Sequence, residues 1–362
     1  MVKLRPKEPL QSFSVAELSF DCLLGTGGFS TVICVHHVGP QHEDDEPSSS
    51  EKDQVITTPE LTVTSDDSLS SSSDLQPSST TSLHQQTTKP RLVEGELALK
   101  ALHKKALSSP KCAQVATQDL RVEVCLLSHL NHSNIVKLVG ISKDFFDSDS
   151  ERPFLILEKL EYTLSDVLKK WQTKAIQNVQ PKGTPLHYLS QASQTSRLRK
   201  VAPGLASAMK YLSDRRIVYR DLKPDNIGFD KNGEVKLFDF ACARAIDPGQ
   251  KLKNRVGTTR YMAPEQASRK PYDCSVDVYS FGLMLWSICT LVKPYKSFVD
   301  KEDLDYIVKE PNIHPSLEPI ASVPMKNLLE SCWLGDPDER PTFEFVALDL
   351  QMELKKPNKI VL

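Results

Sequence analysis

Hydrophobic and polar positions divide the chain into a strand-rich first part and a helix-rich second part. Short runs of apolar and β-branched residues, partly alternating with polar ones, predict strands, because successive side chains of a strand point to opposite faces. The predicted strands span residues 17–24, 30–38, 96–102, 138–142 and 154–158. We expect these five segments to form one small sheet.

Helical patterns separate and follow the strands. One helix is expected over about residues 113–130, where one apolar face is formed by Val115, Leu120, Val124 and Leu127. From Tyr162 onward helical patterns dominate, with short apolar runs at 217–219 and 235–238. The chain is therefore expected to be an α+β protein with a small sheet plus helix and a larger, mainly helical lobe.

Two polar stretches interrupt these patterns. Residues 41–90 are rich in Ser and Thr and lack aromatic residues, and from Gln41 to Thr88 ten acids face a single base. Such a segment cannot bury enough apolar surface to offset the entropy of ordering, so it is predicted to be a disordered acidic insert. Residues 172–196 contain Pro181, Gly183 and Pro185 and are predicted to form a loop insert.

The net charge of -2 is the sum of an acidic segment and a basic remainder of the chain. Outside the acidic segment the chain carries 44 Lys or Arg and 37 Asp or Glu, a net charge of +7. A basic body is compatible with nucleic-acid binding, but the chain has no nucleic-acid recognition motif. Solvated surface charge is the simpler interpretation, and we expect no nucleic-acid partner.

Composition favours a soluble protein in a reducing compartment. The eight cysteines lie far apart without a C-x-x-C pair, and no signal-peptide pattern precedes them, which favours free thiols and disfavours a zinc cluster. The longest apolar run, residues 281–292, falls short of the roughly 20 residues of a membrane span, and neither end carries a lipidation motif. We expect a cytoplasmic location, with the nucleus left open, and no membrane partner.

Candidate chemistry begins at a glycine-rich turn between the first two strands. Residues 25–32 read Gly-Thr-Gly-Gly-Phe-Ser-Thr-Val, and missing side chains let backbone N–H groups approach phosphate oxygens. By itself this turn is equally compatible with an ordinary hairpin. Lys100 follows in Leu-Ala-Leu-Lys on the third strand, and Glu123 lies 23 residues later on the predicted helix. Alone, each of these two charges would normally be a solvated surface group.

The most informative segment is Tyr-Arg-Asp-Leu-Lys-Pro-Asp-Asn at residues 219–226. Asp239-Phe-Ala follows 18 residues after Asp221, and two carboxylates with a carboxamide suit Mg²⁺, which prefers oxygen ligands. With these motifs the sequence resembles a eukaryotic protein kinase over residues 13–354. The resemblance implies the bilobal protein kinase fold, with a small lobe over 13–158 and a large lobe over 159–354.

The resemblance also implies roles for individual residues. Asp221 would orient the acceptor hydroxyl and receive its proton, beside Lys223 and Thr258, while Asn226 and Asp239 would bind Mg²⁺. Lys100, held by Glu123, would neutralise the phosphates of ATP. The nucleotide site would be formed by Leu24, Gly25, Gly27, Val32, Ala98, Lys100, Glu158 and Leu160.

Later motifs extend the resemblance and indicate the substrate class. Residues 257–265 resemble the end of an activation segment, residues 277–282 a central helix, and Arg340 the partner of Glu265 in a buried ion pair. Lys223 and Thr258 are typical of serine/threonine kinases, whereas the Cys-Trp and Arg-Pro-Thr-Phe ending resembles the tyrosine-kinase-like group. We expect a serine/threonine protein kinase of that group, acting on protein substrates in signalling; the oligomeric state is not indicated.

Four residues depart from the kinase pattern: Ser30, Tyr219, Gly228 and Ala241. Tyr219 replaces a histidine and is expected to pack against Phe240. Gly228 replaces a large apolar residue and predicts a roomier adenine pocket, and Ala241 should restrict rearrangement of its segment. Because none of them removes a chemical group, an active enzyme is favoured over the alternative, a pseudokinase that binds ATP or acts as an allosteric scaffold.

The activation segment has an unusual composition. Kinases with an arginine before the catalytic aspartate, here Arg220, often use it to bind a phosphate on this segment. From Phe240 to Gly257 the chain has no Ser, Thr or Tyr. We therefore expect activity that is independent of phosphorylation of this segment.

Overall fold

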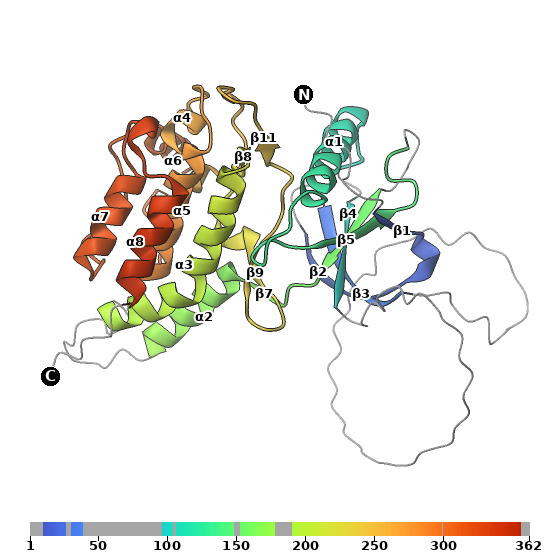
Figure 1. Cartoon of the computed structure of the whole chain (residues 1–362), viewed down its shortest axis with the longest axis horizontal. Helices are drawn as coiled ribbons and strands as arrows, with labels where there is room; N and C mark the ends of the chain where they lie inside the picture. Colours follow the sequence, from blue (N-terminus) through green and yellow to red (C-terminus); the bar gives the residue numbers. More distant parts are fainter. Residues whose placement is uncertain are drawn as a thin grey trace, which may run out of the picture.

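The computed structural model describes residues 10–26, 30–38, 96–103, 106–147, 153–177, 190–298 and 300–355. It has two lobes, one built from a sheet with a single long helix and the other mainly from helices (Figure 1). The α+β class and the two-lobed arrangement are confirmed. The predicted insert 41–90 lies outside the described residues.

The small lobe contains a sheet of six strands in the order β1-β5-β6-β4-β3-β2. Their bounds are β1 Gln11–Phe13, β2 Leu18–Thr26, β3 Ser30–Val38, β4 Leu97–Leu102, β5 Leu138–Ser142 and β6 Phe154–Glu158. All neighbours are antiparallel except β1 and β5.

The expected number of five strands was wrong because β1 was missed. β1 has only three residues, of which Gln11 and Ser12 are exposed, so it lacks an alternating apolar pattern. It approaches β5 at Gly140, where an added Cβ would lie 2.5 Å from the carbonyl oxygen of Gln11 and 2.4 Å from the Phe13 ring. The close approach of β1 therefore requires glycine at this position.

The two faces of the sheet pack against different partners. On one face, buried apolar side chains pack together in one cluster, which contains Phe13, Leu18, Val35, Leu97, Leu99, Phe154 and Ile156. The other face contacts α1, Pro110–Leu127, through Leu155 and Leu157. The Ser109 side chain accepts a hydrogen bond from Cys112 N and Pro110 opens the helix, so α1 begins and ends three residues earlier than predicted.

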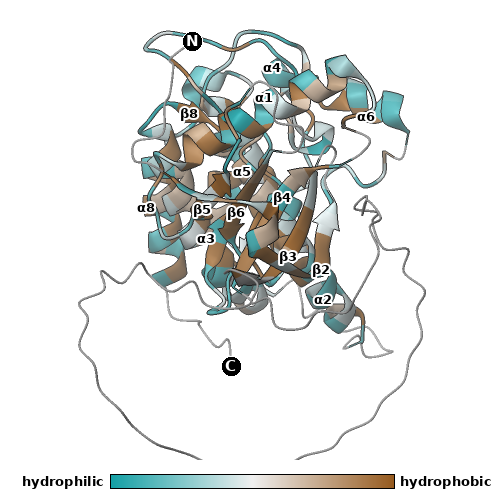
Figure 2. Ribbon diagram, turned by 90° about the vertical axis from the view of Figure 1, so that its right-hand side faces the viewer, coloured by the Kyte–Doolittle hydropathy of each residue, from teal (hydrophilic) through white to brown (hydrophobic). Residues whose placement is uncertain are grey.

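The large lobe is helical. Its helices are α2 Leu164–Gln177, α3 Gln191–Ser213, α4 Pro264–Ala267, α5 Ser275–Thr290, α6 Lys301–Ile307, α7 Val323–Cys332 and α8 Phe343–Lys355. α5 is buried from Val276 to Thr290, and in Figure 2 it is largely brown, like the strands, whereas the peripheral α6 is largely teal. The long apolar run is thus core, and no helix in the described part of the chain is long and apolar enough to cross a bilayer.

The ends of the predicted loop 172–196 are helical. α2 continues to Gln177, and α3 begins at Gln191 after Ser190, whose side chain accepts a hydrogen bond from Ser193 N. Residues 178–189 lie outside the described residues. The loop was predicted from the prolines in the middle of the stretch. The predicted bounds included the end of α2 and the beginning of α3, so the loop is shorter than expected.

Short strands between the lobes carry the loops that contain the kinase-like motifs. β7 Tyr162–Thr163, β9 Ile227–Phe229 and β10 Val235–Leu237 form one small sheet, and β8 Ile217–Val218 pairs with β11 Arg244–Ala245. Residues 219–226 connect β8 to β9, and residues 238–243 connect β10 to β11. The two paired connections bring both motifs to the same side of the large lobe.

Candidate active site

Three charged side chains from separate segments meet between the lobes. The Nζ atom of Lys100, in β4, lies 2.6 and 2.8 Å from the carboxylate oxygens of Glu123, in α1, and 2.8 Å from Oδ1 of Asp239. Burial by itself lowers the pKa of Lys100, but the carboxylates of Asp239 and Glu123 raise it above its ordinary value. Lys100 therefore carries its charge, and the small lobe is joined to the loop of Asp239.

Glu123 has a second partner in the same loop. Its Oε1 atom accepts a hydrogen bond of 3.1 Å from Phe240 N. Burial raises the pKa of Asp239, but the charge of Lys100 outweighs it, and the pKa lies below the ordinary value. Asp239 is thus held as an anion, with its side chain 37% exposed.

Asp221 is surrounded by residues of its own lobe. Its Oδ1 atom accepts hydrogen bonds from Thr258 N at 2.8 Å and Thr258 Oγ1 at 2.7 Å. Its Oδ2 atom accepts from Lys223 Nζ at 2.7 Å and from Asn226 Nδ2 at 3.0 Å. Lys223 Nζ also lies 2.9 Å from Thr258 Oγ1, so these four side chains form one connected network.

The backbone that presents Asp221 is fixed from below by Asp277 of α5. The buried carboxylate of Asp277 accepts hydrogen bonds from Tyr219 N at 2.7 Å and Arg220 N at 2.8 Å. Burial raises the pKa of Asp277 to about 7, although the two backbone hydrogen bonds stabilise the carboxylate and lower its pKa. The same loop and the next one contain left-handed residues, Arg220 with φ 71° and Asp239 with φ 61°. Uncommon backbone conformations of this kind concentrate at functional sites.

Gly257 lets the activation segment approach this loop. A Cβ atom at Gly257 would lie 2.3 Å from the carbonyl oxygen of Arg220, and its φ of 97° is unfavourable for other residues. The glycine therefore allows Thr258, the next residue, to reach Asp221.

Asn226 and Asp239 have the donor atoms that a magnesium site requires. The amide nitrogen of Asn226 donates to the backbone and side chain of Asp221, which leaves its carbonyl oxygen as the free ligand atom. Phe238 N donates to Asn226 O at 3.1 Å, so the residue before Asp239 is joined to Asn226. A carboxylate and an amide oxygen on adjacent segments suit Mg²⁺.

Most of the predicted nucleotide-site residues lie in or beside strands of the small lobe. Leu24 and Gly25 lie near the end of β2, and in the sheet Val32 pairs with Lys100. Ala98 lies two residues before Lys100 and therefore faces the same side. Leu160 follows the last strand of the sheet. Gly27 lies outside the described residues.

The side chain of Glu158 is held by partners in the chain itself. Its Oε1 atom accepts hydrogen bonds from Lys137 N at 2.8 Å and Lys236 Nζ at 3.0 Å. Any contact with a nucleotide would therefore be through the backbone of Glu158.

Two of the four departures from the kinase pattern have structural explanations. A Cβ atom at Gly228 would lie 2.5 Å from Cδ1 and 3.2 Å from Cβ of Leu160, so the Leu160 side chain packs against this glycine. Leu160 fills the space that a larger residue would take. Tyr219 packs edge-on against Phe240 with ring centroids 5.3 Å apart, as expected, and its hydroxyl donates to Phe238 O.

The activation segment is held by residues that the sequence analysis missed. Arg220 donates from NH1 to the Tyr272 hydroxyl at 3.2 Å, and that hydroxyl donates to Asn254 O at 2.6 Å. Leu252 and Tyr272 exchange two backbone hydrogen bonds of 2.8 Å. Lys251 pairs with Asp273 at 3.3 Å. Tyr272, which a short β-bridge joins to Leu252, thus contacts Arg220, at the position that binds a phosphate in many kinases.

Two further ion pairs fix the end of this segment. Arg255 pairs with Asp305 of α6, which holds the pKa of Asp305 at about 2. Arg340 contacts both carboxylate oxygens of Glu265 at 2.6 and 3.0 Å, and both residues are buried. The expected Glu265–Arg340 pair is therefore confirmed.

Comparison with known proteins identifies the family. The protein kinase domain model matches residues 88–349. In Arabidopsis thaliana, the serine/threonine/tyrosine-protein kinase HT1 is 28% identical over 65% of this chain and 54% of its own length. The serine/threonine-protein kinase STY46 is 27% identical over 71% of this chain and 40% of its own length. STY17 is 35% identical over 40% of this chain and 25% of its own. The chain spans about half or less of the length of these curated relatives.

Proposed function

Because the chain belongs to the protein kinase domain family, we propose that it transfers the γ-phosphoryl group of ATP to serine or threonine hydroxyls of proteins. The observation that carries this proposal is the network of Asp221 with Lys223, Thr258 and Asn226. It holds a carboxylate in one orientation, beside a lysine and a threonine. A protein scaffold without catalysis would not need this arrangement.

In this proposal Asp221 positions the acceptor hydroxyl and receives its proton. Lys223 contacts Asp221 Oδ2 and supplies positive charge beside the transferring group. Thr258 fixes the other oxygen of the carboxylate, so that only a limited set of acceptor positions can reach it. Positioning and electrostatic stabilisation are the main contributions of a protein to phosphoryl transfer.

Lys100 and the metal ligands serve the nucleotide. Lys100 stays charged between Glu123 and Asp239 and is placed to neutralise phosphate oxygens. When bound through Asn226 and Asp239, Mg²⁺ would neutralise the charge that develops on the transferred phosphoryl group. The retained contacts among Lys100, Glu123 and Asp239 argue against the pseudokinase alternative.

The relatives support the acceptor class. HT1 is named a serine/threonine/tyrosine-protein kinase, and STY46 and STY17 are named serine/threonine-protein kinases. Together with Lys223 and Thr258 beside Asp221, these names favour serine and threonine as acceptors. Protein substrates and a cytoplasmic site of action complete the proposal.

The test is transfer of the γ-phosphoryl group from Mg²⁺-ATP to serine, threonine and tyrosine peptides. Asp221→Asn should lower kcat on the order of 10² to 10⁴-fold with little change in ATP binding, because the proton acceptor is lost. Asp225→Asn is the matched control, since this exposed carboxylate lies in the same loop. Transfer at the wild-type rate by Asp221→Asn would refute the assignment.

A further inference from the structure

A β-bulge at the base of the glycine-rich hairpin gathers three potential metal ligands. In the β2–β3 ladder Phe20 pairs with Val35 and Leu23 pairs with Ile33. Two residues of β2, Asp21 and Cys22, therefore lie opposite one residue of β3, Cys34. A bulge of this kind changes the direction of side chains that would otherwise alternate between the two faces of the sheet.

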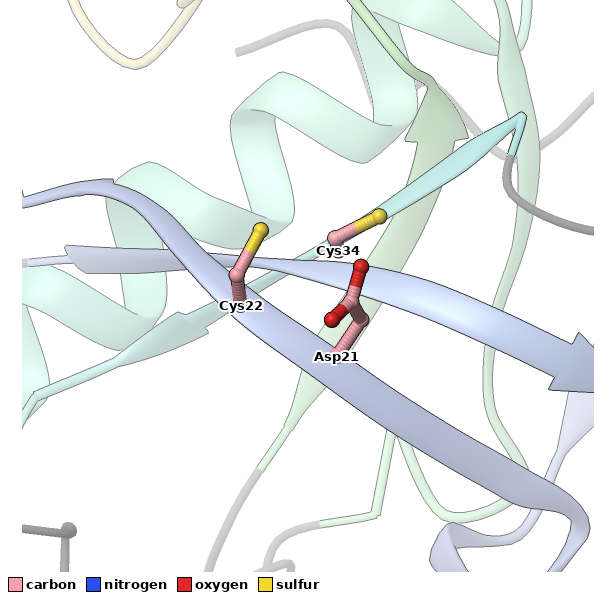
Figure 3. A group of neighbouring side chains, drawn as sticks. All are labelled: Asp21, Cys22 and Cys34. Atoms are coloured by element: carbon pink, nitrogen blue, oxygen red, sulfur yellow. The ribbon is translucent and has the colours of Figure 1, made fainter. Parts of the chain in front are cut away.

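The bulge brings the three side chains together. One ligand atom from each of Asp21, Cys22 and Cys34 lies within 4.8 Å of the other two. Figure 3 shows them beside one another on the two adjacent strands. Cys34 is buried, whereas Asp21 and Cys22 are exposed, so the group has a protected base and an open side.

These distances suit a thiophilic cation. Around tetrahedral Zn²⁺, with Zn–S bonds of about 2.3 Å, two sulfur ligands are separated by about 3.8 Å. The three atoms therefore need to approach one another by little more than about 1 Å. Two thiolates and a carboxylate are ligands that Zn²⁺ and Cd²⁺ accept, and the exposed side leaves a fourth position for water.

We propose that Asp21, Cys22 and Cys34 form a binding site for a thiophilic divalent cation of the Zn²⁺ class. Binding deprotonates the two thiols, which release their protons to solvent, and forms two metal–sulfur bonds and one metal–oxygen bond. The site is separate from the magnesium ligands Asn226 and Asp239.

A shared cation would offset the repulsion among the ionised forms of these three groups. Burial raises the pKa of Cys34, and the nearby Cys22 and Asp21 raise it further, while Lys159 opposes them. Three groups that each become negative on ionisation are stabilised by a shared cation.

The proposed cation site and Lys100 lie on the same face of the sheet. Cys34 pairs with Ala98, and two residues away Val32 pairs with Lys100, so Cys34 faces the same side of the sheet as Lys100. Cys22 lies two residues before Leu24. A bound cation would therefore join β2 to β3 at the base of the turn that begins at Gly25.

The experiment titrates the reduced full-length chain with Cd²⁺ and follows thiolate-to-cadmium charge-transfer absorption and thermal unfolding. We expect one Cd²⁺ per chain, a higher Tm, and weaker binding at lower pH as the thiols hold their protons. Cys22→Ser should abolish this absorption and the Tm shift, and Asp21→Asn should weaken binding at least about tenfold. Cys112→Ser is the matched control, because this thiol is also exposed but lies on α1, outside the proposed site.

Cys34→Ser tests the buried ligand, and the exposed Cys22→Ser keeps the test valid if Cys34→Ser does not fold. Cd²⁺ binding that persists in Cys22→Ser, or is absent from the reduced wild-type chain, would overturn the proposal. A second result would also overturn it. In that case the reduced chain takes up no Cd²⁺, and peroxide removes two free thiols from the wild-type chain but not from Cys22→Ser. That result would identify the pair as a disulfide-forming switch.

Discussion

The two aspartates of the candidate site are held in opposite ways. Asp221 accepts hydrogen bonds from Lys223, Asn226 and Thr258, all within the large lobe. Asp239 contacts Lys100, which belongs to the small lobe. The geometry around Asp221 can therefore persist when the lobes move, whereas the contact of Asp239 reports how the lobes are placed.

The comparison separates two requirements of the proposed reaction. The acceptor side is assembled by local contacts within one loop and the end of the activation segment. The nucleotide side depends on a contact between residues 139 positions apart in the chain. Substitutions on the acceptor side and on the nucleotide side should therefore differ in their effects on the unfolding free energy.

The largest effect is expected for Lys100→Met. It leaves the fully buried Glu123 without its cation, and breaking a buried ion pair costs roughly 3–5 kcal/mol of unfolding free energy. Lys223→Met, with a partly exposed lysine, should cost about 1 kcal/mol, because Asp221 keeps Thr258 and Asn226. Urea unfolding measures both, and equal losses in the two variants would remove the distinction between the sites.

Gly257→Ala should disrupt the acceptor side. Its φ alone costs another residue about 1–3 kcal/mol, and the overlap with Arg220 O displaces Thr258, so phosphoryl transfer should also fall. Gly249→Ala is the control, because φ is 77° there but no atom lies within 4 Å of the added Cβ. Similar transfer rates in the two variants would show that Thr258 does not need this approach.

Asp277 should give the unfolding free energy a measurable pH dependence. Its pKa is about 7 in the folded chain against an ordinary 3.8, so between these values the folded chain binds the extra proton. This group therefore makes the unfolding free energy fall as pH rises, on the order of 2 kcal/mol from pH 5 to 7. Urea unfolding at both pH values should show a smaller decrease for Asp277→Asn than for wild type. An unchanged decrease would assign the dependence to other groups.

Gly228→Leu probes the contact between Gly228 and Leu160. Overpacking against Leu160 should destabilise the chain by about 1–3 kcal/mol. Adding Leu160→Ala to Gly228→Leu should restore part of the lost unfolding free energy, because it removes the side chain that the new leucine would overlap. A double-mutant cycle measures the coupling, and simple additivity would mean that the two side chains do not compete.

The parts of the site that follow fixed spacing were predictable from the sequence. Lys100, Glu123, Asp221 and Asp239 lie in motifs whose residue types and order carry chemical meaning, and the sheet followed the apolar pattern. The short β1 was not predictable in this way, because three residues show no periodicity.

Contacts between isolated residues could not be predicted. Tyr272 meets Arg220 across 52 positions, and nothing around either residue marks the pair. Asp21 and Cys22 would face opposite sides of a regular strand, so their approach to Cys34 depends on a bulge that the apolar pattern does not reveal.

We expect the chain's own side chains to complete the active site without a phosphate on the activation segment. The most direct test of this expectation is phosphoryl transfer by phosphatase-treated protein to serine and threonine peptides. We expect the treated protein to retain its activity, because Arg220 already donates to the Tyr272 hydroxyl, which in turn donates to Asn254 O of the segment. Loss of activity that only phosphorylation of Thr259 restores would contradict this claim.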